Sequence, residues 1–357
     1  MPRHEQGSAQ PASCPVPHWR DGPGRRTASR RLRGVALATL VALGLSVPLP
    51  AFGWGRKVSL ARKYRPGQKM VYQTNLRTRA EVHSDPPGLK DFLPPLPTEF
   101  SLRQQNTLTI EAVRSDGTAD IQNRFDQLEM HSDLPERLPE HLRDSARQAQ
   151  EDFSRRMAGQ VLIVHYDREG RLLGFEGAEE VFQQLDASLR EPLRQVLRLF
   201  LEQMGGHTLY PDHQVKPGEE WKRKLAAPPT DDHPFSLEGE STLHYAGKTR
   251  YRGVKAARVD FRFQNVLTPS VEGLRRLGPL AQLEARGLGL EIRIDGQGQG
   301  RVLLALDDGR VLQNHATIHQ TLHARLRNSG DLPLPASQPI KLEIQSETEL
   351  EVEGSGK

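Results

Sequence analysis

Residues 68–83 read QKMVYQTNLRTRAEVH, and this stretch decides the fold class. Its even positions carry mostly apolar side chains, whereas its odd positions carry polar or charged ones. Side chains two residues apart lie on the same face of a strand, so one face of this strand is buried and the other faces water. The same alternation recurs in 257–264, 287–294 and 340–352. Half-buried strands of this kind are typical of antiparallel sheets.

Helical patterns lie between the two β-rich parts of the chain. In 140–157 apolar residues recur at helical spacing, and 177–204 carries a broader apolar stripe that Pro192 interrupts. We therefore predict an α+β fold with a large, curved, antiparallel sheet that stays open like an incomplete barrel. Two or three helices are expected over its apolar face, with the helical cover spanning 139–204.

An internal repeat is the main feature of the domain organisation. Pro66-Gly67 and Pro217-Gly218 each precede a strand, and each strand leads into a proline-rich segment that ends in Phe-Ser-Leu. Two later strand–turn–strand segments also match in the same order. This order predicts one β-rich domain over 54–357 that is built from duplicated half-units, 58–175 and 210–353.

The first 53 residues have the pattern of a secretory signal. Arginines precede the uncharged run 34–47, and Ala51 and Gly53 follow in the spacing that signal peptidase reads. The run is shorter than the ~20 residues that a membrane span needs. We predict cleavage between Gly53 and Trp54 and export to the periplasm or the extracellular space. Membrane contact is expected only through the leader, before cleavage.

Charge, cysteine content and motifs exclude several functions for the predicted domain, residues 54–357. The chain has a formal net charge of +4, and the arginine-rich leader accounts for this excess, so no basic field favours nucleic acid. The one cysteine, Cys14, lies in the leader, which excludes thiol chemistry and disulfides in this domain. The glycine-rich segment 296–300 opens no helix, so we interpret it as a turn between strands. We expect no catalytic residues, no metal, no cofactor and no enzymatic activity.

Three histidines, His315, His319 and His323, form the sharpest metal candidate. They alternate with threonines on one side and apolar residues on the other, which indicates a strand. On a strand, neighbouring histidines lie ~13 Å apart, too far to share one ion. We instead predict an antiparallel hairpin with 340–353, stabilised by cross-strand charge pairs. In the predicted register, Arg325 faces Glu343, His319 faces Glu349 and His315 faces Glu353.

The proline-rich loop 84–99 is the best candidate for contact with a ligand or partner, because it carries Phe92, Leu93 and Leu96. Long loops of this kind are either functional or disordered, and the sequence leaves both alternatives open. The expected partner is an apolar small molecule or an envelope protein. Two functions remain open: a cell-envelope or secreted protein that binds an apolar, lipid-like ligand, and a structural or protein-interaction module with a filled core. A carrier needs an apolar void of roughly 300 Å³ or more, which a filled module lacks.

The chain resembles an uncharacterised family of exported bacterial proteins, domain of unknown function 6263. The residues that carry this resemblance are the leader, Pro66-Gly67, the segment VKPGEEW at 215–221, and Gly309-Arg310. The resemblance implies an exported β-rich protein and supplies no catalytic residues. Many members look like lipoproteins, but this chain lacks a cysteine at the cleavage point. In architecture alone, the predicted fold is also similar to the open β-barrels that carry lipoproteins or lipids through the envelope.

Overall fold

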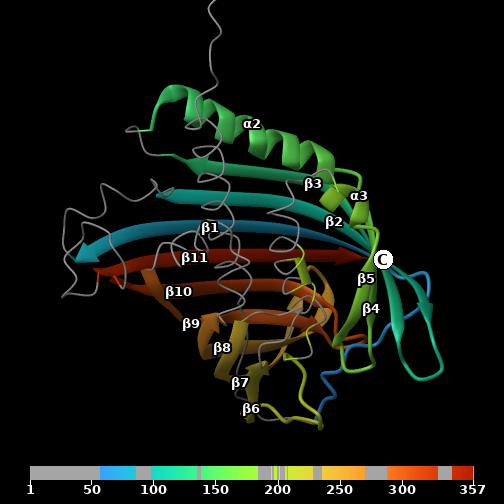
Figure 1. The fold of residues 1–357 in the computed structure, drawn as a ribbon. Coiled ribbons are helices and arrows are strands. Elements are labelled where there is room, and N and C mark those ends of the chain that lie inside the picture. The colour runs from blue at the N-terminus through green and yellow to red at the C-terminus, as the bar shows by residue number, and fades with distance from the viewer. Residues whose placement is uncertain are drawn as a thin grey trace, which may run out of the picture.

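The computed structural model describes residues 57–85, 98–134, 138–183, 194, 197–198, 201, 206, 208–227, 235–269, 288–328 and 340–356. These residues form one antiparallel sheet of 11 strands, together with the helices α2 and α3 (Figure 1). The elements in chain order are β1 (Lys69–Asp85), β2 (Glu99–Val113), β3 (Ala119–Asp133), α2 (Glu140–Met157), β4 (Val161–Tyr166), β5 (Leu172–Glu176), α3 (Glu179–Gln183), β6 (Glu220–Ala227), β7 (Phe235–Tyr251), β8 (Val254–Pro269), β9 (Leu288–Ala305), β10 (Val311–Asn328) and β11 (Ile340–Gly356).

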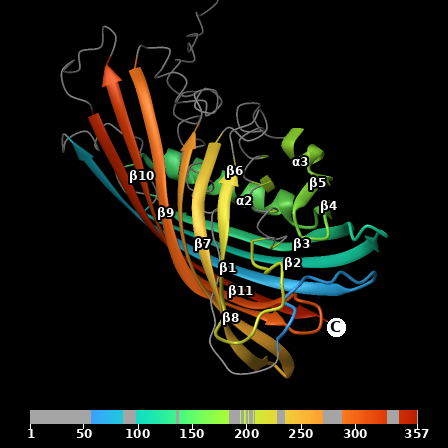
Figure 2. The ribbon, with the colours of Figure 1, turned by 90° about the horizontal axis from the view of Figure 1, so that it is seen from below.

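The sheet is an open meander. Its strand order is β5-β4-β3-β2-β1-β11-β10-β9-β8-β7-β6, so chain neighbours pair with each other and β1 pairs with β11 to join the two halves. β5 and β6 form the two edges, so the sheet does not close into a barrel. The sheet bends around the side on which α2 and α3 lie (Figure 2).

The fold is mainly β, so the α+β prediction is wrong in that respect. The predicted helix over 140–157 is confirmed as α2, which lies beside β3, where Gln150 donates a hydrogen bond to Ser132 at 2.9 Å. Phe153 and Met157 of α2 pack into the core. Most of 184–204 lies outside the described residues, so the predicted second helix there stays a prediction.

Alternate residues give the sheet an inner and an outer face. The inner face carries Met70, Leu76 and Ile318, which are buried, and the outer face carries exposed side chains such as Arg77 and Glu349. Two core clusters lie on the inner face, one over β1–β4 with α2 and one over β6–β10. The alternation read from 68–83 is therefore confirmed along the whole of β1.

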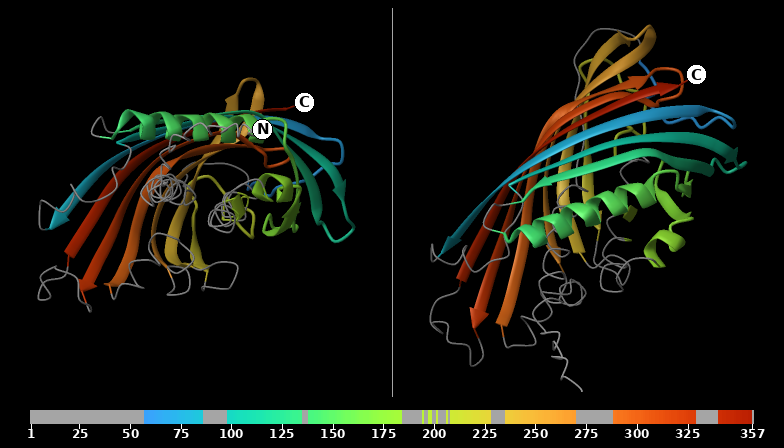
Figure 3. Two further views of the ribbon diagram at one scale, coloured as in Figure 1. Left: turned by 45° about the horizontal axis from the view of Figure 1, so that its top comes forward. Right: turned by 90° about the horizontal axis from the view of Figure 1, so that it is seen from above.

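The two ends of the sheet differ in how the strands are connected. Short turns at 114–118, 252–253 and 306–310 join β2 to β3, β7 to β8 and β9 to β10 at one end, which we call the turn end. At the opposite end, the far end, β1 stops at Asp85 and β10 stops at Asn328. Figure 3 shows the long strands running from one end to the other across the curved sheet.

The two halves share a local geometry at the matched Pro-Gly pairs. Gly67 donates its backbone N–H to Ile110 on β2 at 2.8 Å, and Gly218 donates to Tyr245 on β7 at 3.1 Å. Both glycines have positive φ angles, 79° and 94°, which an L side chain rarely adopts. A common origin of the halves stays a prediction, and so do the proposed domain limits.

The glycine-rich segment 296–300 lies inside β9, so its interpretation as a turn is wrong. A Cβ added to Gly298 would lie 2.4 Å from the ring of Phe263, and one added to Gly300 would lie 2.4 Å from the ring of Phe261. Both rings come from the adjacent strand β8. Glycine at every second position of β9 therefore makes room for two aromatic rings that lie across the strand.

Candidate binding face

The turn end of the inner face is closed by two segments that precede β1 and β6. Leu60 from the first segment and Val215 from the second are almost fully buried against the sheet. Val58 and Val215 also bridge the two segments through backbone hydrogen bonds of 2.8 and 3.0 Å. Tyr210 donates its hydroxyl to the Gly309 carbonyl at 2.8 Å and so fixes the second segment to the β9–β10 turn.

A buried ion pair holds the β9–β10 turn. Asp308 has 1 % exposure and accepts hydrogen bonds from Arg310 and from Gln68, both at 2.5 Å. Its backbone carbonyl accepts from Lys63 at 2.8 Å. Burial alone raises the pKa of Asp308, but the hydrogen bonds from Arg310 outweigh burial and hold that pKa below its ordinary value of 3.8. The carboxylate is therefore charged at neutral pH and fastens the turn end.

A second cation at the turn end has no carboxylate partner among the described residues. The Arg62 guanidinium lies over the Tyr64 ring, 5.5 Å from its centroid, and its Nη2 atom lies 3.2 Å from the sulfur of Met70. Burial works against the charge of Arg62, but Tyr72, Tyr210 and Tyr64 outweigh it and raise the pKa of Arg62. This cluster of ring, sulfur and guanidinium packs the first segment against β1.

Toward the far end, one continuous apolar row crosses six strands of the inner face. Each member lies directly opposite the next in the strand pairing, from β7 through β8, β9, β10 and β11 to β1. At a strand spacing of about 4.8 Å the row is about 24 Å long. The apolar row consists of Leu237, Leu267, Ile294, Leu322, Ile344 and Val82.

The apolar row is less buried than the core at the turn end. Leu267 is buried at 1 % exposure, but Leu322, Ile344 and Val82 are only half-buried. Ile110, near the turn end of the same face, is fully buried. The inner face is therefore packed at the turn end and keeps partly accessible apolar side chains toward the far end.

A row of small and polar residues lies next to the apolar row on its turn-end side. It crosses the same six strands and is here called the polar row: Gly239, Asn265, Gly296, Gln320, Ser346 and Ala80. Gln320 has 4 % exposure and Asn265 has 6 %, so two amides are buried on a face that is otherwise mainly apolar. The Oε1 atom of Gln320 has no hydrogen-bond partner among the described residues.

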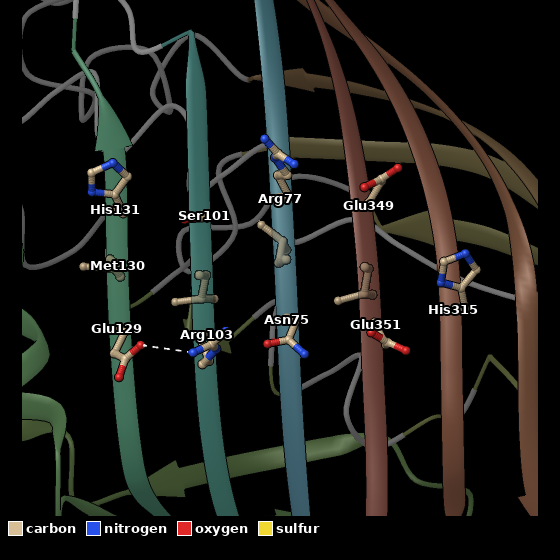
Figure 4. Close-up of a pocket in the computed structure, with 13 residues that line it drawn as sticks. Asn75, Arg77, Ser101, Arg103, Glu129, Met130, His131, His315, Glu349 and Glu351 are labelled. Carbon is tan, nitrogen blue, oxygen red and sulfur yellow. Dashed lines mark ion pairs between the residues drawn. The ribbon is translucent and has the colours of Figure 1, made fainter.

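The outer face carries a hollow of about 570 Å³ over β3, β2, β1, β11 and β10 (Figure 4). Exposed side chains of both charges line it, and Figure 4 marks one ion pair, between Arg103 and Glu129 at 3.9 Å. Arg103 and Glu129 are 74 % and 67 % exposed, so water screens them strongly. This arrangement supplies no buried, oriented polar group of the kind that catalysis or tight binding needs.

The predicted histidine strip lies on the outer face of β10, and its register is a correction. The hairpin of β10 and β11 is confirmed, but it is displaced by two residues from the prediction. A shift of two keeps every side chain on its face, so alternation alone does not distinguish the two registers. The observed partners are His315 with Glu351, His319 with Glu347, His323 with Glu343 and Arg325 with Lys341, whereas Glu349 lies opposite Thr317 and Glu353 opposite Gln313.

The charge contacts follow the observed register. His323 lies between Asp295 and Glu343, at 3.5 and 3.7 Å. Glu353 accepts hydrogen bonds from Tyr251 at 2.7 Å and from Arg252 at 2.8 Å, across the turn end. Among the residues that the structure describes, no three His, Cys, Asp or Glu side chains form a group that could hold a metal ion.

Two sets of predicted residues lie outside the described residues. These are the processing site at Gly53 and Trp54, and the loop residues Phe92, Leu93 and Leu96. Both sets stay predictions. In the described part of the chain, no helix is long and apolar enough to cross a bilayer.

Comparisons with known proteins give only distant likenesses. No protein-family model matches the sequence, and no curated protein matches it. A structure concerned with lipid–protein interactions in lipovitellin matches with a TM-score of 0.35 at 9 % identity, and the match covers 81 % of this chain but 25 % of that chain. An outer membrane channel from Pseudomonas putida F1 matches with a TM-score of 0.11 at 8 % identity, over 82 % of this chain and 97 % of that one.

These likenesses are architectural and do not define the function. This chain spans about a quarter of the lipovitellin chain that it matches. Membership of the uncharacterised exported family stays a prediction, because no family model supports it.

Proposed function

We propose that this protein is an exported, non-enzymatic binding protein that holds an apolar, lipid-like ligand on the far end of its inner face. The observation that carries the proposal is the continuous apolar row, whose members Leu322, Ile344 and Val82 keep accessible surface. Contiguous apolar surface of this kind on a soluble protein marks an interaction site. The proposal of export rests on the arginine-rich leader, and that of a non-enzymatic role on the lack of a catalytic motif in the sequence.

The curvature of the sheet supports a ligand rather than a flat partner. The sheet bends around the inner face, so strands as far apart as β7 and β1 lie on one concave side (Figure 2). The turn end of this concave side is covered by Leu60, Val215 and their neighbours. An apolar chain lying along the row would contact six strands at once and bury the half-exposed side chains.

A matched pair of β11 variants tests the proposal. Ile344→Lys places a charge in the apolar row, whereas Gln345→Lys places the same charge one residue away on the exposed outer face. We expect Ile344→Lys to weaken the binding of a neutral apolar fluorophore, N-phenyl-1-naphthylamine, by about tenfold or more, because a charge near an apolar ligand is costly. Gln345→Lys should bind the fluorophore like the wild type.

Native mass spectrometry supplies an independent readout. Protein purified from an exporting bacterial host should carry a co-purified lipid, and Ile344→Lys should carry less. Equal circular dichroism spectra would show that both variants are folded. Absence of both fluorophore binding and co-purified lipid in the wild type would contradict the proposal and favour a structural or protein-interaction module with a filled interior.

A further inference from the structure

We propose that the polar row, centred on Gln320 and Asn265, binds an uncharged hydroxyl group of the ligand, which makes the ligand a neutral amphiphile such as a long-chain alcohol or an acylglycerol. This inference rests on the proposed function and adds the chemical class of the ligand. Its basis is the burial of Gln320 at 4 % exposure with an Oε1 atom that has no hydrogen-bond partner among the described residues.

A buried polar atom without a partner is costly, and paired amides on the inner face show one way in which this cost is avoided. On β2 and β3, the Gln104 amide donates a hydrogen bond to Asn106 at 2.5 Å, and the Asn106 amide donates one to Asn123 at 2.9 Å. The buried hydroxyls of Thr78 and Thr348 also pair with each other at 2.9 Å. The Nδ2 atom of Asn123 and the hydroxyl of Tyr245 also lack a partner among the described residues. Leaving a buried polar atom unpaired costs stability, so such atoms call for an explanation in each case.

The position of Gln320 connects the unpaired atom with the apolar row. Gln320 and Leu322 lie two residues apart on the same face of β10, which places them about 7 Å apart along the strand. Asn265 lies on β8, opposite Gly296, and an added Cβ on Gly296 would meet the Asn265 Oδ1 atom at 2.1 Å. The Asn265 amide therefore extends over Gly296 toward β10, on which Gln320 lies opposite Gly296.

The composition of the polar row selects the kind of head group. None of its six members is charged, so a carboxylate or phosphate would find no counter-charge within the row. A hydroxyl both donates and accepts, so it can satisfy a glutamine amide in either of its two orientations. Ser346, at the β11 position of the row, is half-buried, which leaves this part of the row accessible.

The test compares ligands with the same chain and different ends. Dodecane, 1-dodecanol and dodecanoate would compete against N-phenyl-1-naphthylamine on the wild type, on Gln320→Leu and on the control Gln297→Leu, which makes the same exchange on the exposed outer face of β9. For the wild type we expect dodecanol to compete about tenfold more strongly than dodecane, as a paired buried amide implies. Dodecanoate should compete less well than dodecanol.

The variants separate the hydroxyl contact from general apolar binding. Gln320→Leu should bring the dodecanol-to-dodecane ratio close to one while dodecane binding is kept, and Gln297→Leu should leave the ratio unchanged. The unfolding midpoint of Gln320→Leu should equal or exceed that of the wild type, because a buried amide oxygen without a partner is removed. Equal competition by dodecane and dodecanol in the wild type, a stronger effect of dodecanoate, or an unchanged ratio in Gln320→Leu would each overturn this inference. Failure of the wild type to bind the fluorophore would instead overturn the proposed function.

Discussion

The turn end and the far end of the inner face share one sheet, but they are completed differently. At the turn end, Leu60, Tyr210 and Val215 pack onto the sheet, and the buried carboxylate of Asp308 ties these segments to the β9–β10 turn. At the far end, the strands continue with the same alternation, but several apolar side chains, among them Leu322, Ile344 and Val82, are only half-buried. The same strands therefore supply a closed core at one end and an accessible apolar face at the other.

This difference shows that alternation alone does not decide whether a face becomes core. Ile110 and Ile344 follow the same pattern in their strands, yet Ile110 is fully buried and Ile344 is not. Among the described residues, Ile110 belongs to a core cluster that includes Phe153 and Met157 of α2, whereas Ile344 belongs to no such cluster. A stable end and an accessible end on one sheet would allow the protein to keep its fold while a ligand is exchanged.

The largest expected effect comes from breaking the anchor of the turn end. Asp308→Asn removes the charge that pairs with Arg310, whose side chain is 13 % exposed, and leaves that guanidinium buried without its carboxylate. We expect the free energy of unfolding to fall by about 4 kcal/mol, the usual loss when one partner of a buried pair is removed. Urea unfolding followed by tryptophan fluorescence measures this loss.

A neighbouring residue supplies the control for this variant. The carboxylate of Asp307 lies 3.9 Å from Arg310 and is 55 % exposed, so Asp307→Asn should cost no more than about 0.5 kcal/mol. Binding of the apolar fluorophore at the far end should survive in folded Asp308→Asn. Similar losses in the two variants would contradict the view that Asp308 anchors the turn end.

The same carboxylate predicts a dependence of stability on acid. Because the pKa of Asp308 in the fold lies below its ordinary value of 3.8, its stabilisation is fully present above that value and is lost as the pH falls through the lower, folded value. Unfolding midpoints measured from about pH 5 down to about pH 2 should fall less steeply for Asp308→Asn than for the wild type. Parallel curves would show that other carboxylates dominate the acid limb.

A smaller loss is expected from filling the space under an aromatic ring. In Gly300→Ala the added Cβ would lie 2.2 Å from the His315 carbonyl oxygen and 2.4 Å from the Phe261 ring, so backbone and ring must both move. We expect a loss of about 2 kcal/mol, which is typical of overpacking. Gly174→Ala in β5 is the control, because nothing lies within 4 Å of its added Cβ, and its unfolding midpoint should barely change. A neutral Gly300→Ala would mean that the middle of the inner face is loosely packed.

The spacing of apolar residues was sufficient to predict several strands and one helix, but it did not predict how the strands are arranged in the sheet. It predicted β1 and the β10–β11 pair, and helical spacing predicted α2 over 140–157. It did not determine the register of β10 against β11, because a displacement by two residues keeps His315 and Glu351 on the same face. The glycines of 296–300 have a spacing of two, which is the period of a strand, but glycine is also common in turns, so the sequence alone did not identify the strand.

The candidate site depends on contacts that no single segment contains. The apolar row joins six strands, and its members become neighbours only once all five registers are known. Gln320 is one polar residue in an alternating strand, and its burial and its unpaired Oε1 atom become visible only in the fold. The period of two at Leu322 and Ile344 was the available signal, and it identified a buried face without showing which end is covered.

The smallest expected effect tests the comparison of the turn end with the far end most directly. One methyl group is removed from an isoleucine at each end of the inner face. Ile110→Val at the turn end should lower the free energy of unfolding by about 1 kcal/mol, because its site is fully buried and leaves a void. Ile344→Val at the far end should cost about 0.3 kcal/mol, since part of its side chain already contacts water. Urea midpoints measured in triplicate resolve this difference. Equal losses would show that the far end is packed as tightly as the turn end, and the inner face would then have no accessible region in which to hold a ligand.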